Sequence, residues 1–334
     1  MTSVPLSVLD LSPVPSGGSS QRALADTVAL AQEVERLGYE RFWVAEHHAN
    51  PGVASSAPAV LIAAIAAATG QIRVGSGGVM LSNHAPLVVA EQFGTLEALF
   101  PGRVDLGVGR APGADPATES ALRRGFSAED FAGELLALRS FFDGDWVKGH
   151  PWARLVAQPA LGNGPALWLL GSSTYSAQVA GMFGLPFAFA HHFAPAATLT
   201  ALELYRSSFA ASEVLDAPYA MVCVTVVLAD DDERARALAM PAALSALRLR
   251  RGKPGLLPSP QEAGAYRYAP QERAFVDDRL DQQAVGGPEK VRRRLDELVT
   301  ATGADELMVT TMVHDPRDRL RSFALLADLR VAPV

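Results

Sequence analysis

The sequence predicts an α/β protein folded as a single (β/α)8 TIM barrel, and three observations support this prediction. Short apolar segments alternate with longer segments of helical periodicity along all 334 residues. Most of the short segments are continuous apolar runs, as expected for parallel strands buried on both faces. There are eight of them, each followed by at least one predicted helix, and this is the count that closes a barrel. An open doubly wound sheet is the alternative architecture.

The predicted strands are spread over the chain from residue 6 to residue 311. They are Leu6–Leu11, Phe42–Glu46, Arg73–Met80, Val104–Gly109, Ala166–Leu170, Phe187–Ala190, Ala220–Leu228 and Glu306–Thr311. The predicted helices have recognisable ends: Gly38 ends the first, and Pro58 lies in the first turn of the second. These helices are Arg22–Leu37, Pro58–Ala68, Leu87–Leu99, Ala128–Phe142, Ser176–Phe183, Thr198–Ser212, Asp232–Leu249, Pro288–Ala301 and Arg317–Leu329.

One segment, residues 250–287, breaks this alternation. It contains Pro254, Pro258, Pro260 and Pro270 and ends in a glycine pair at 286 and 287. Structureless segments of this length are usually functional or mobile. Because the segment follows the seventh strand and its first helix, we expect an insertion outside the barrel wall. It would be either a mobile lid over the active-site mouth or a poorly ordered excursion, within one domain that spans residues 1–334.

The composition narrows the class of protein and of partner. The chain is 49% hydrophobic and carries a formal net charge of −7, without a basic stripe, so we expect no nucleic-acid partner. The single cysteine, Cys223, lies in an apolar run and is expected in the core. No signal peptide is evident, and the longest apolar run, Ala57–Thr69, is too short to span a bilayer. These features predict a cytoplasmic protein that does not enter membranes.

Polar groups and histidines follow the predicted strands, where the active sites of such barrels lie. Adjacent strand residues face opposite sides, so only one histidine of each neighbouring pair can face a shared ligand, and we expect no metal site. A histidine at this rim is either a hydrogen-bonded structural residue or an acid–base group that titrates near neutral pH. The rim residues are Glu46-His47-His48, Asn83-His84, Arg110, Gly171-Ser172-Ser173 and His191-His192.

The segment Gly171–Ser176 joins the fifth strand to a helix and is a candidate phosphate site. Small residues let a phosphate approach the backbone, and a helix N-terminus offers unpaired N–H groups. Ordinary helix capping by Ser172 or Ser173 explains the same residues. Arg110, at the end of the neighbouring strand, favours the phosphate site because a guanidinium can bind phosphate through two hydrogen bonds.

Two glycines, Gly77 and Gly78, lie inside the third strand, where glycine normally weakens a sheet. Either a flat ring presses against the backbone there, or the barrel has a simple kink. The run Gly107–Gly113 is only superficially similar to a dinucleotide-binding loop, because its third glycine is displaced and Pro112 interrupts the helix. The sequence therefore has no nicotinamide-binding fingerprint.

The chain resembles the bacterial luciferase-like flavin-dependent monooxygenases over nearly its whole length. It is most similar to a subgroup that includes tailoring oxygenases of aromatic polyketide pathways, which belong to antibiotic biosynthesis. The resemblance is vague only between residues 250 and 287. The residues that carry it are Ala45–His48, Ile72–Gly78, His84–Pro86, Ala90–Gln92, Pro101–Arg103, Leu106–Arg110, Gly171–Ser173 and Ser176-Ala177.

This resemblance implies a two-component monooxygenase. Reduced FMN would arrive from a separate NAD(P)H-dependent flavin reductase, and one atom of O2 would be inserted into a small organic substrate, with an aromatic polyketide as one candidate. It implies that His47 is the catalytic residue near the flavin and that Gly77–Gly78 is a non-proline cis peptide bond. The residues expected to bind the cofactor are Glu46, Ser76, Gly77, Gly78, Arg110, Gly171, Ser172, Ser173 and Ser176.

The chain also departs from luciferase itself. It has glycines where luciferase has alanines on the third strand, and no match to luciferase's mobile loop, so light emission is not expected. Two alternatives remain on the same fold: hydride transfer with the deazaflavin F420, and a non-catalytic flavin-binding barrel. The predicted helix Pro58–Ala68 is apolar on nearly every side, which predicts a homodimer through this helix and Leu87–Leu99.

Overall fold

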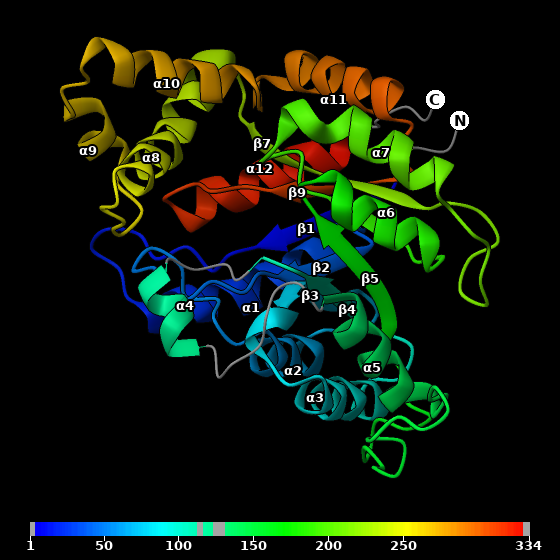
Figure 1. Ribbon diagram of the computed structural model, residues 1–334. Coiled ribbons are helices and arrows are strands. Elements are labelled where there is room, and N and C mark those ends of the chain that lie inside the picture. The colour runs from blue at the N-terminus through cyan, green and yellow to red at the C-terminus, as the bar shows by residue number, and fades with distance from the viewer. Residues whose placement is uncertain (1–3, 112–115, 123–130, 330–334) are drawn as a thin grey trace.

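The computed structural model describes residues 4–111, 116–122 and 131–329, and a closed parallel barrel forms the centre of the described chain (Figure 1). The strand order is β6-β5-β4-β3-β2-β1-β9-β7, and a further β6–β7 pairing closes the ring. The (β/α)8 prediction is confirmed. The barrel strands are β1 (Leu6–Asp10), β2 (Arg41–Val44), β3 (Arg73–Met80), β4 (Val104–Gly109), β5 (Ala166–Gly171), β6 (Phe187–Phe189), β7 (Ala220–Leu228) and β9 (Glu306–Thr310).

Helices surround this barrel. Serine and aspartate side chains cap several of them; Ser19, for example, accepts a hydrogen bond from the backbone N–H of Arg22. The predicted helix Ala128–Phe142 begins outside the described residues. The helices are α1 (Ser20–Arg36), α2 (Pro58–Ala68), α3 (Pro86–Leu99), α4 (Pro116–Leu122), α5 (Phe131–Asp143), α6 (Thr174–Met182), α7 (Thr198–Ser207), α8 (Asp232–Arg250), α11 (Pro288–Thr302) and α12 (Pro316–Asp328), with 3-10 turns at Leu81–Asn83 and Pro195–Ala197.

Residues 250–287 differ from the sequence prediction, because they contain regular structure: helices α9 (Pro260–Ala265) and α10 (Pro270–Asp281) and the short strand β8 (Ala284–Gly286). Pro260 and Pro270 do not break helices here, since each lies in the first turn of one. A capping box between Ser259 and Glu262 begins α9. Helices α8, α9 and α10 lie together at the upper left of Figure 1.

Strand β8 pairs with β7 beyond the end of β6. Along a strand, the backbone N–H and C=O groups of successive residues point alternately to the strand on one side and to the strand on the other. Residues separated by an even number of positions therefore face the same neighbouring strand. Cys223 and Ala229 belong to one set: Cys223 accepts from the backbone N–H of His192, which follows β6, and Ala229 donates to Gly286 of β8. Val226 belongs to the other set, because its carbonyl accepts from Thr311, which follows β9. The insertion is therefore attached to the barrel directly above the carboxyl end of β6.

The interior of the barrel is filled by large side chains. Trp43 lies at its centre, and its ring meets that of Trp168 edge to face, with 5.2 Å between the centroids. A Cβ atom on Gly77 would lie 2.7 Å from the Cδ1 atom of Leu9 and 3.2 Å from the Trp43 ring, so a larger residue would require these side chains to shift. Part of the glycine requirement on β3 therefore comes from packing inside the barrel.

Below this packing lies a buried ionic network at the amino ends of the strands. Arg41 donates to Glu306 at 3.0 Å and to Asp105 at 3.0 Å, and both carboxylates are fully buried. Burial raises the pKa of Glu306, and Arg41 and two hydroxyl donors oppose this only in part, so the pKa is raised overall. Burial lowers the pKa of Arg41, but the carboxylates of Glu306 and Asp105 outweigh this effect and raise the pKa overall. Arg41 therefore stays charged. One guanidinium thus holds two carboxylates from opposite parts of the chain.

We predict that Arg41→Met lowers the free energy of unfolding by about 3–5 kcal/mol, because it leaves Asp105 and Glu306 buried without their shared cation. Urea denaturation at neutral pH measures this change. The matched control is Arg22→Met: Arg22 pairs with Asp26 at 2.9 Å but its side chain is 74% exposed. That variant should lose less than about 1 kcal/mol. Equal losses in the two variants would contradict the prediction.

Candidate active site

Glu46 organises the carboxyl ends of β2 and β3. Its carboxylate is fully buried and lies 2.9 Å from Nε2 of His48 and 2.9 Å from Nε2 of His84. The backbone N–H of Met80 donates to its second oxygen at 3.1 Å. Burial raises the pKa of Glu46, but the two histidines and the backbone donor outweigh it and lower the pKa overall. Glu46 is therefore an ionised anchor that positions two histidines and the end of β3.

Both histidine pairs lie beyond the ends of their strands, in the segments that follow β2 and β6. His48 contacts Glu46, and His191 contacts Thr198 of α7, with 2.8 Å between Nδ1 and Oγ1. His47 lies near enough to His192 for its charge to affect the titration of His192. The segments after β2 and β6 thus come together at the carboxyl end of the barrel.

His192 is partly buried and neutral. Burial lowers its pKa to about 4, and the cations Arg279, His191 and His47 lower it further, whereas the Cys223 carbonyl opposes them. Cys223 itself is a buried free thiol whose pKa is raised by burial, as expected for a core cysteine. The mouth therefore holds imidazole rather than imidazolium at position 192 near neutral pH.

On the other side of the mouth, Arg110 lies beside the start of α6. Its guanidinium stacks over the ring of Tyr175, 4.4 Å from the centroid, and Tyr175 is in the first turn of α6. Ser173 is the N-cap residue, but its side chain makes no capping hydrogen bond. Ser176 packs so closely on Gly171 that a Cβ atom at Gly171 would collide with it. Arg110 therefore lies beside the first turn of α6, and its pairing with the Ser172–Ser173 turn stays a prediction.

Strand β3 carries the expected non-proline cis peptide bond between Gly77 and Gly78, so that prediction is confirmed. Ser76 is fully buried, and its hydroxyl donates to the carbonyl of Gly107 on β4 at 2.9 Å. The Ser76 hydroxyl therefore joins strands β3 and β4. Gly78 is close to the same carbonyl, since a Cβ atom there would lie 2.8 Å from it.

Glu46, His47, Arg110 and the Ser172–Ser173 turn follow or end parallel strands and therefore lie at one end of the barrel, whereas Ser76, Gly77 and Gly78 lie within β3. Sequence reasoning placed His48 and His84 at the rim but missed their contacts with Glu46, and it missed Tyr175 and Arg279. The motif Glu46-His47-His48 was a sequence signal for the contact between Glu46 and His48. No sequence pattern pointed to Arg279, because this residue belongs to the insertion.

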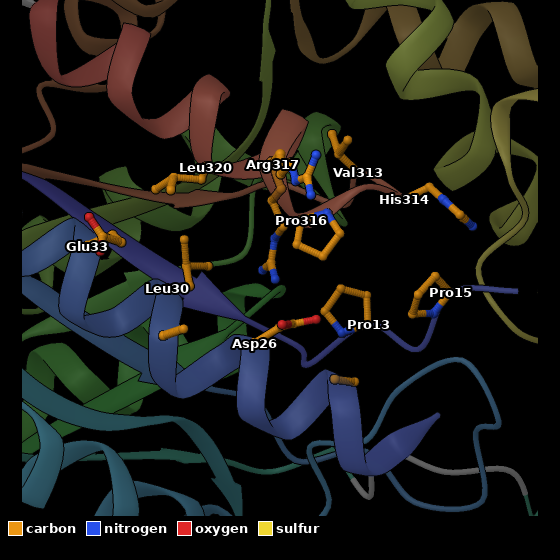
Figure 2. Close-up of a pocket in the computed structure, with 13 residues that line it drawn as sticks. Pro13, Pro15, Asp26, Leu30, Glu33, Val313, His314, Pro316, Arg317 and Leu320 are labelled. Atoms are coloured by element: carbon orange, nitrogen blue, oxygen red, sulfur yellow. The ribbon is translucent and has the colours of Figure 1, made fainter. Parts of the chain in front are cut away.

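A separate cavity of about 190 Å³ lies outside the barrel wall, between α1 and α12 (Figure 2). Asp26, Leu30 and Glu33 line it from α1, and Arg317 and Leu320 line it from α12. None of the predicted site residues lines this cavity. Within the described ranges, no group of three or more potential ligands is placed to hold a metal ion, and no helix is long and apolar enough to cross a membrane.

Comparison with known families decides the class. Residues 4–306 match the family model described as luciferase-like monooxygenase. The chain belongs to the luciferase-like monooxygenase family. This is a family of flavin-dependent oxygenases, whose members use reduced flavin or the deazaflavin F420. The resemblance inferred from the rim motifs is therefore confirmed.

Three similar proteins each match at least 97% of this chain. A Bacillus subtilis (strain 168) protein, YvbT, is 51% identical over 97% of this chain and 96% of its own. A protein of Escherichia coli (strain K12), named luciferase-like monooxygenase, is 45% identical over 98% and 97%. The crystal structure of apo-MsnO8 has a TM-score of 0.89 at 42% identity and covers 99% of this chain and 100% of that one.

We predict that His192 makes the protein less stable as the pH falls from about 6.5 towards 4. The folded-state pKa of about 4 lies below the unfolded value of 6.5, so the unfolded chain binds more protons in this window. The loss should reach about 3 kcal/mol, from roughly 1.4 kcal/mol per pKa unit. The measurement is the urea unfolding free energy of wild type minus that of His192→Asn, followed from pH 7 to pH 4. A difference that does not change with pH would refute a buried neutral His192.

Proposed function

We propose that this protein is an FMN-dependent monooxygenase that uses reduced FMN from a separate NAD(P)H-dependent reductase. One observation carries the proposal: the Arg110 guanidinium stacks on Tyr175 in the first turn of α6, the helix that directly follows Ser172 and Ser173. A guanidinium and the free N–H groups of a helix start form a site for a phosphate dianion. FMN carries such a phosphate.

The residues present fit this cofactor. Arg110, Gly171, Ser172, Ser173 and Ser176 would bind its phosphate, and Gly77–Gly78 on β3 would support its ring. Bound reduced FMN would supply the chemistry of oxygen activation, so that one atom of O2 enters the substrate. The protein's tasks are to bind, to orient and to exclude water.

His47 is proposed as the acid–base group near the flavin, because it follows β2 at the carboxyl end of the barrel while His48 is engaged with Glu46. Glu46 would act as a positioning residue, since its carboxylate is occupied by His48, His84 and the Met80 N–H. Helices α9 and α10 would cover the mouth, because the backbone of Leu257, shortly before α9, pairs with Val14 and Ser16 of the β1–α1 loop. We propose that this insertion keeps bulk water from the site.

Relatives support oxygenation of a small organic substrate. The N-acetyl-S-alkylcysteine monooxygenase of Bacillus subtilis (strain 168) is 45% identical over 56% of this chain. A 4-hydroxyprotoasukamycin monooxygenase is 33% identical over 52%. The oxygenating constituent of 3,6-diketocamphane monooxygenase, with the same fold at 20% identity, was solved in complex with FMN. A thioether of the first kind and an aromatic polyketide are therefore the two substrate types to test first.

We predict that Arg110→Met weakens binding of reduced FMN by about 10- to 100-fold, because hydrogen bonds to a charged phosphate are worth about 1.5–3 kcal/mol. Anaerobic titration followed by calorimetry measures this. Reduced riboflavin, which lacks the phosphate, is the matched control and should bind both proteins equally. Tighter binding of reduced F420 than of reduced FMN would instead favour hydride transfer without oxygen.

Incorporation of labelled oxygen distinguishes an oxygenase from a flavin carrier. With reduced FMN supplied by an unrelated reductase, 18O from O2 should appear in a product from one of the two substrate types. His47→Ala should reduce this incorporation while leaving FMN binding intact. A protein that binds FMN but oxidises neither substrate type, with or without His47, would be the non-catalytic alternative.

The same proposal includes a homodimer through α2 and α3. Helix α2 has no charged residue, yet Val60 is 73% exposed. On the adjacent helix α3, Val88 is 45% and Leu99 is 64% exposed. A second copy of the chain would remove this apolar surface from water.

We predict that Val60→Lys shifts the protein from dimer to monomer in light scattering at micromolar concentration, because it places a charge in the proposed interface. Val147→Lys is the control, since Val147 is equally exposed, at 74%, but lies in the loop after α5, outside the two helices of the proposed interface. A wild-type protein that is already monomeric under these conditions would contradict the proposed homodimer.

A further inference from the structure

The cavity between α1 and α12 is a candidate binding site outside the barrel. Asp26, Leu30 and Glu33 lie on one face of α1, because residues three or four positions apart on a helix share a face. Figure 2 shows Leu30 on one side of the cavity and Leu320 and Arg317 of α12 on the other. The volume is about 190 Å³, whereas a cavity of about 150 Å³ accommodates benzene. A molecule with a single ring therefore fits.

Most of the cavity wall is apolar. Ala23, Leu30 and Val313 are buried side chains that line it. Three prolines extend the same wall, namely Pro13, Pro15 and Pro316. Ligand pockets are typically apolar with a few polar groups that fix orientation. The body of a ligand in this cavity is therefore expected to be apolar.

The hydrogen-bond donors on the wall come from α12. Arg319 is buried and lines the cavity. Its Nε donates to the carbonyl of Thr311 at 2.8 Å and its Nη2 to Asp10, whereas its Nη1 has no hydrogen-bond partner among the described residues. The backbone N–H of Arg317 donates to Asp315 at 2.8 Å, but its guanidinium bonds to no residue that the structure describes. Both guanidinium groups thus keep donors for a ligand.

The acidic residues on the opposite wall already have cations. Asp26 pairs with Arg22 at 2.9 Å, and Glu33 pairs with Arg36. Both arginines are exposed and belong to α1 itself. The cavity therefore has compensated anions on α1 and, on α12, a cation without a counterion in the described chain. This arrangement favours an anionic ligand over a cationic one.

The loops at one end of the cavity also hold the insertion. Pro15, which lines the cavity, forms a β-bridge with Leu257. The next residue, Ser16, donates to Glu262 of α9, and its hydroxyl oxygen lies 3.4 Å from Nε2 of His314. His314 lines the cavity as well. A ligand that contacts Pro15 and His314 would therefore hold the two loops on which the insertion rests.

We propose that this cavity binds a small monocarboxylate with an apolar ring, and that the ligand stabilises the attachment of the insertion. The carboxylate accepts hydrogen bonds from Arg317 and Arg319, and the ring packs between Leu30 and Leu320. Release of the insertion would free the cavity wall at Pro15, so ligand binding and attachment favour each other. The proposed site lies outside the barrel wall, so it does not depend on the proposed function.

The test is calorimetric titration of the protein, without added FMN, with benzoate and with phenylacetate, each compared with its neutral amide. The wild type should bind at least one acid with a Kd of about 1 mM or below, and about 10-fold or more tightly than its amide. Arg317→Met should reduce this preference by about 10-fold, because hydrogen bonds to charged groups are lost. Leu320→Trp, which fills the cavity, should remove binding of acid and amide alike.

Arg321→Met is the matched control, because Arg321 lies on the same helix, but its side chain is 61% exposed and pairs with Asp230 at 2.9 Å. It should bind acids and amides like the wild type. Circular dichroism and urea unfolding check that each variant folds. Equal binding of acid and amide by the wild type would overturn the inference. Acid binding that neither Arg317→Met nor Leu320→Trp changes would also overturn it, because the acid would then bind elsewhere.

Hydrogen exchange tests the link to the insertion. The backbone N–H of Ser16 donates to Leu257, and that of Leu257 donates to Val14, so both amides report on the attachment. With benzoate at about ten times its Kd, their exchange should slow about 10-fold, because the ligand has to dissociate before the insertion is released. Leu320→Trp should remove this effect of benzoate. Unchanged exchange in the wild type at saturating benzoate would refute the stabilising role.

Discussion

The packing inside the barrel is the constraint on which the rest of this structure depends. Trp43 fills the centre, and it fits only because β3 presents Gly75 and Gly77 to it: a Cβ atom on Gly75 would lie 2.8 Å from the indole nitrogen. The same nitrogen donates to Asp105 at 2.9 Å, which joins this packing to the ionic network below. Protein interiors tolerate little change in volume, so the glycines and the tryptophan must be present together.

The geometry of the mouth follows from this packing. Three residues after Trp43, the chain leaves β2 and places Glu46 against the end of β3, where the Met80 N–H and two histidines surround the carboxylate. Once β2 and β3 are fixed, β4 and β5 follow in register, with Val108 opposite Leu169. That register brings Arg110 to the start of α6. A site assembled from four neighbouring strands is thereby held by rigid elements, as catalytic positioning requires.

The insertion adds a second layer to this arrangement. It is bound to the β1–α1 loop through Leu257 and to β7 through β8, so it is attached at two sides of the mouth. In the proposed function, the cofactor would be bound on the side of β3 to β5, while the insertion is attached on the side of β6 and β7.

The sequence by itself determined the barrel, because parallel buried strands and amphipathic helices have local patterns of residues. It also determined which residues stand at strand ends, hence Glu46, His47, Arg110 and the Ser172–Ser173 turn, because the topology places every such end at one mouth. Only the tertiary structure decided that Glu46 contacts both His48 and His84, and that residues 250–287 contain helices. The reason is that contacts between residues far apart in sequence leave no periodic signal.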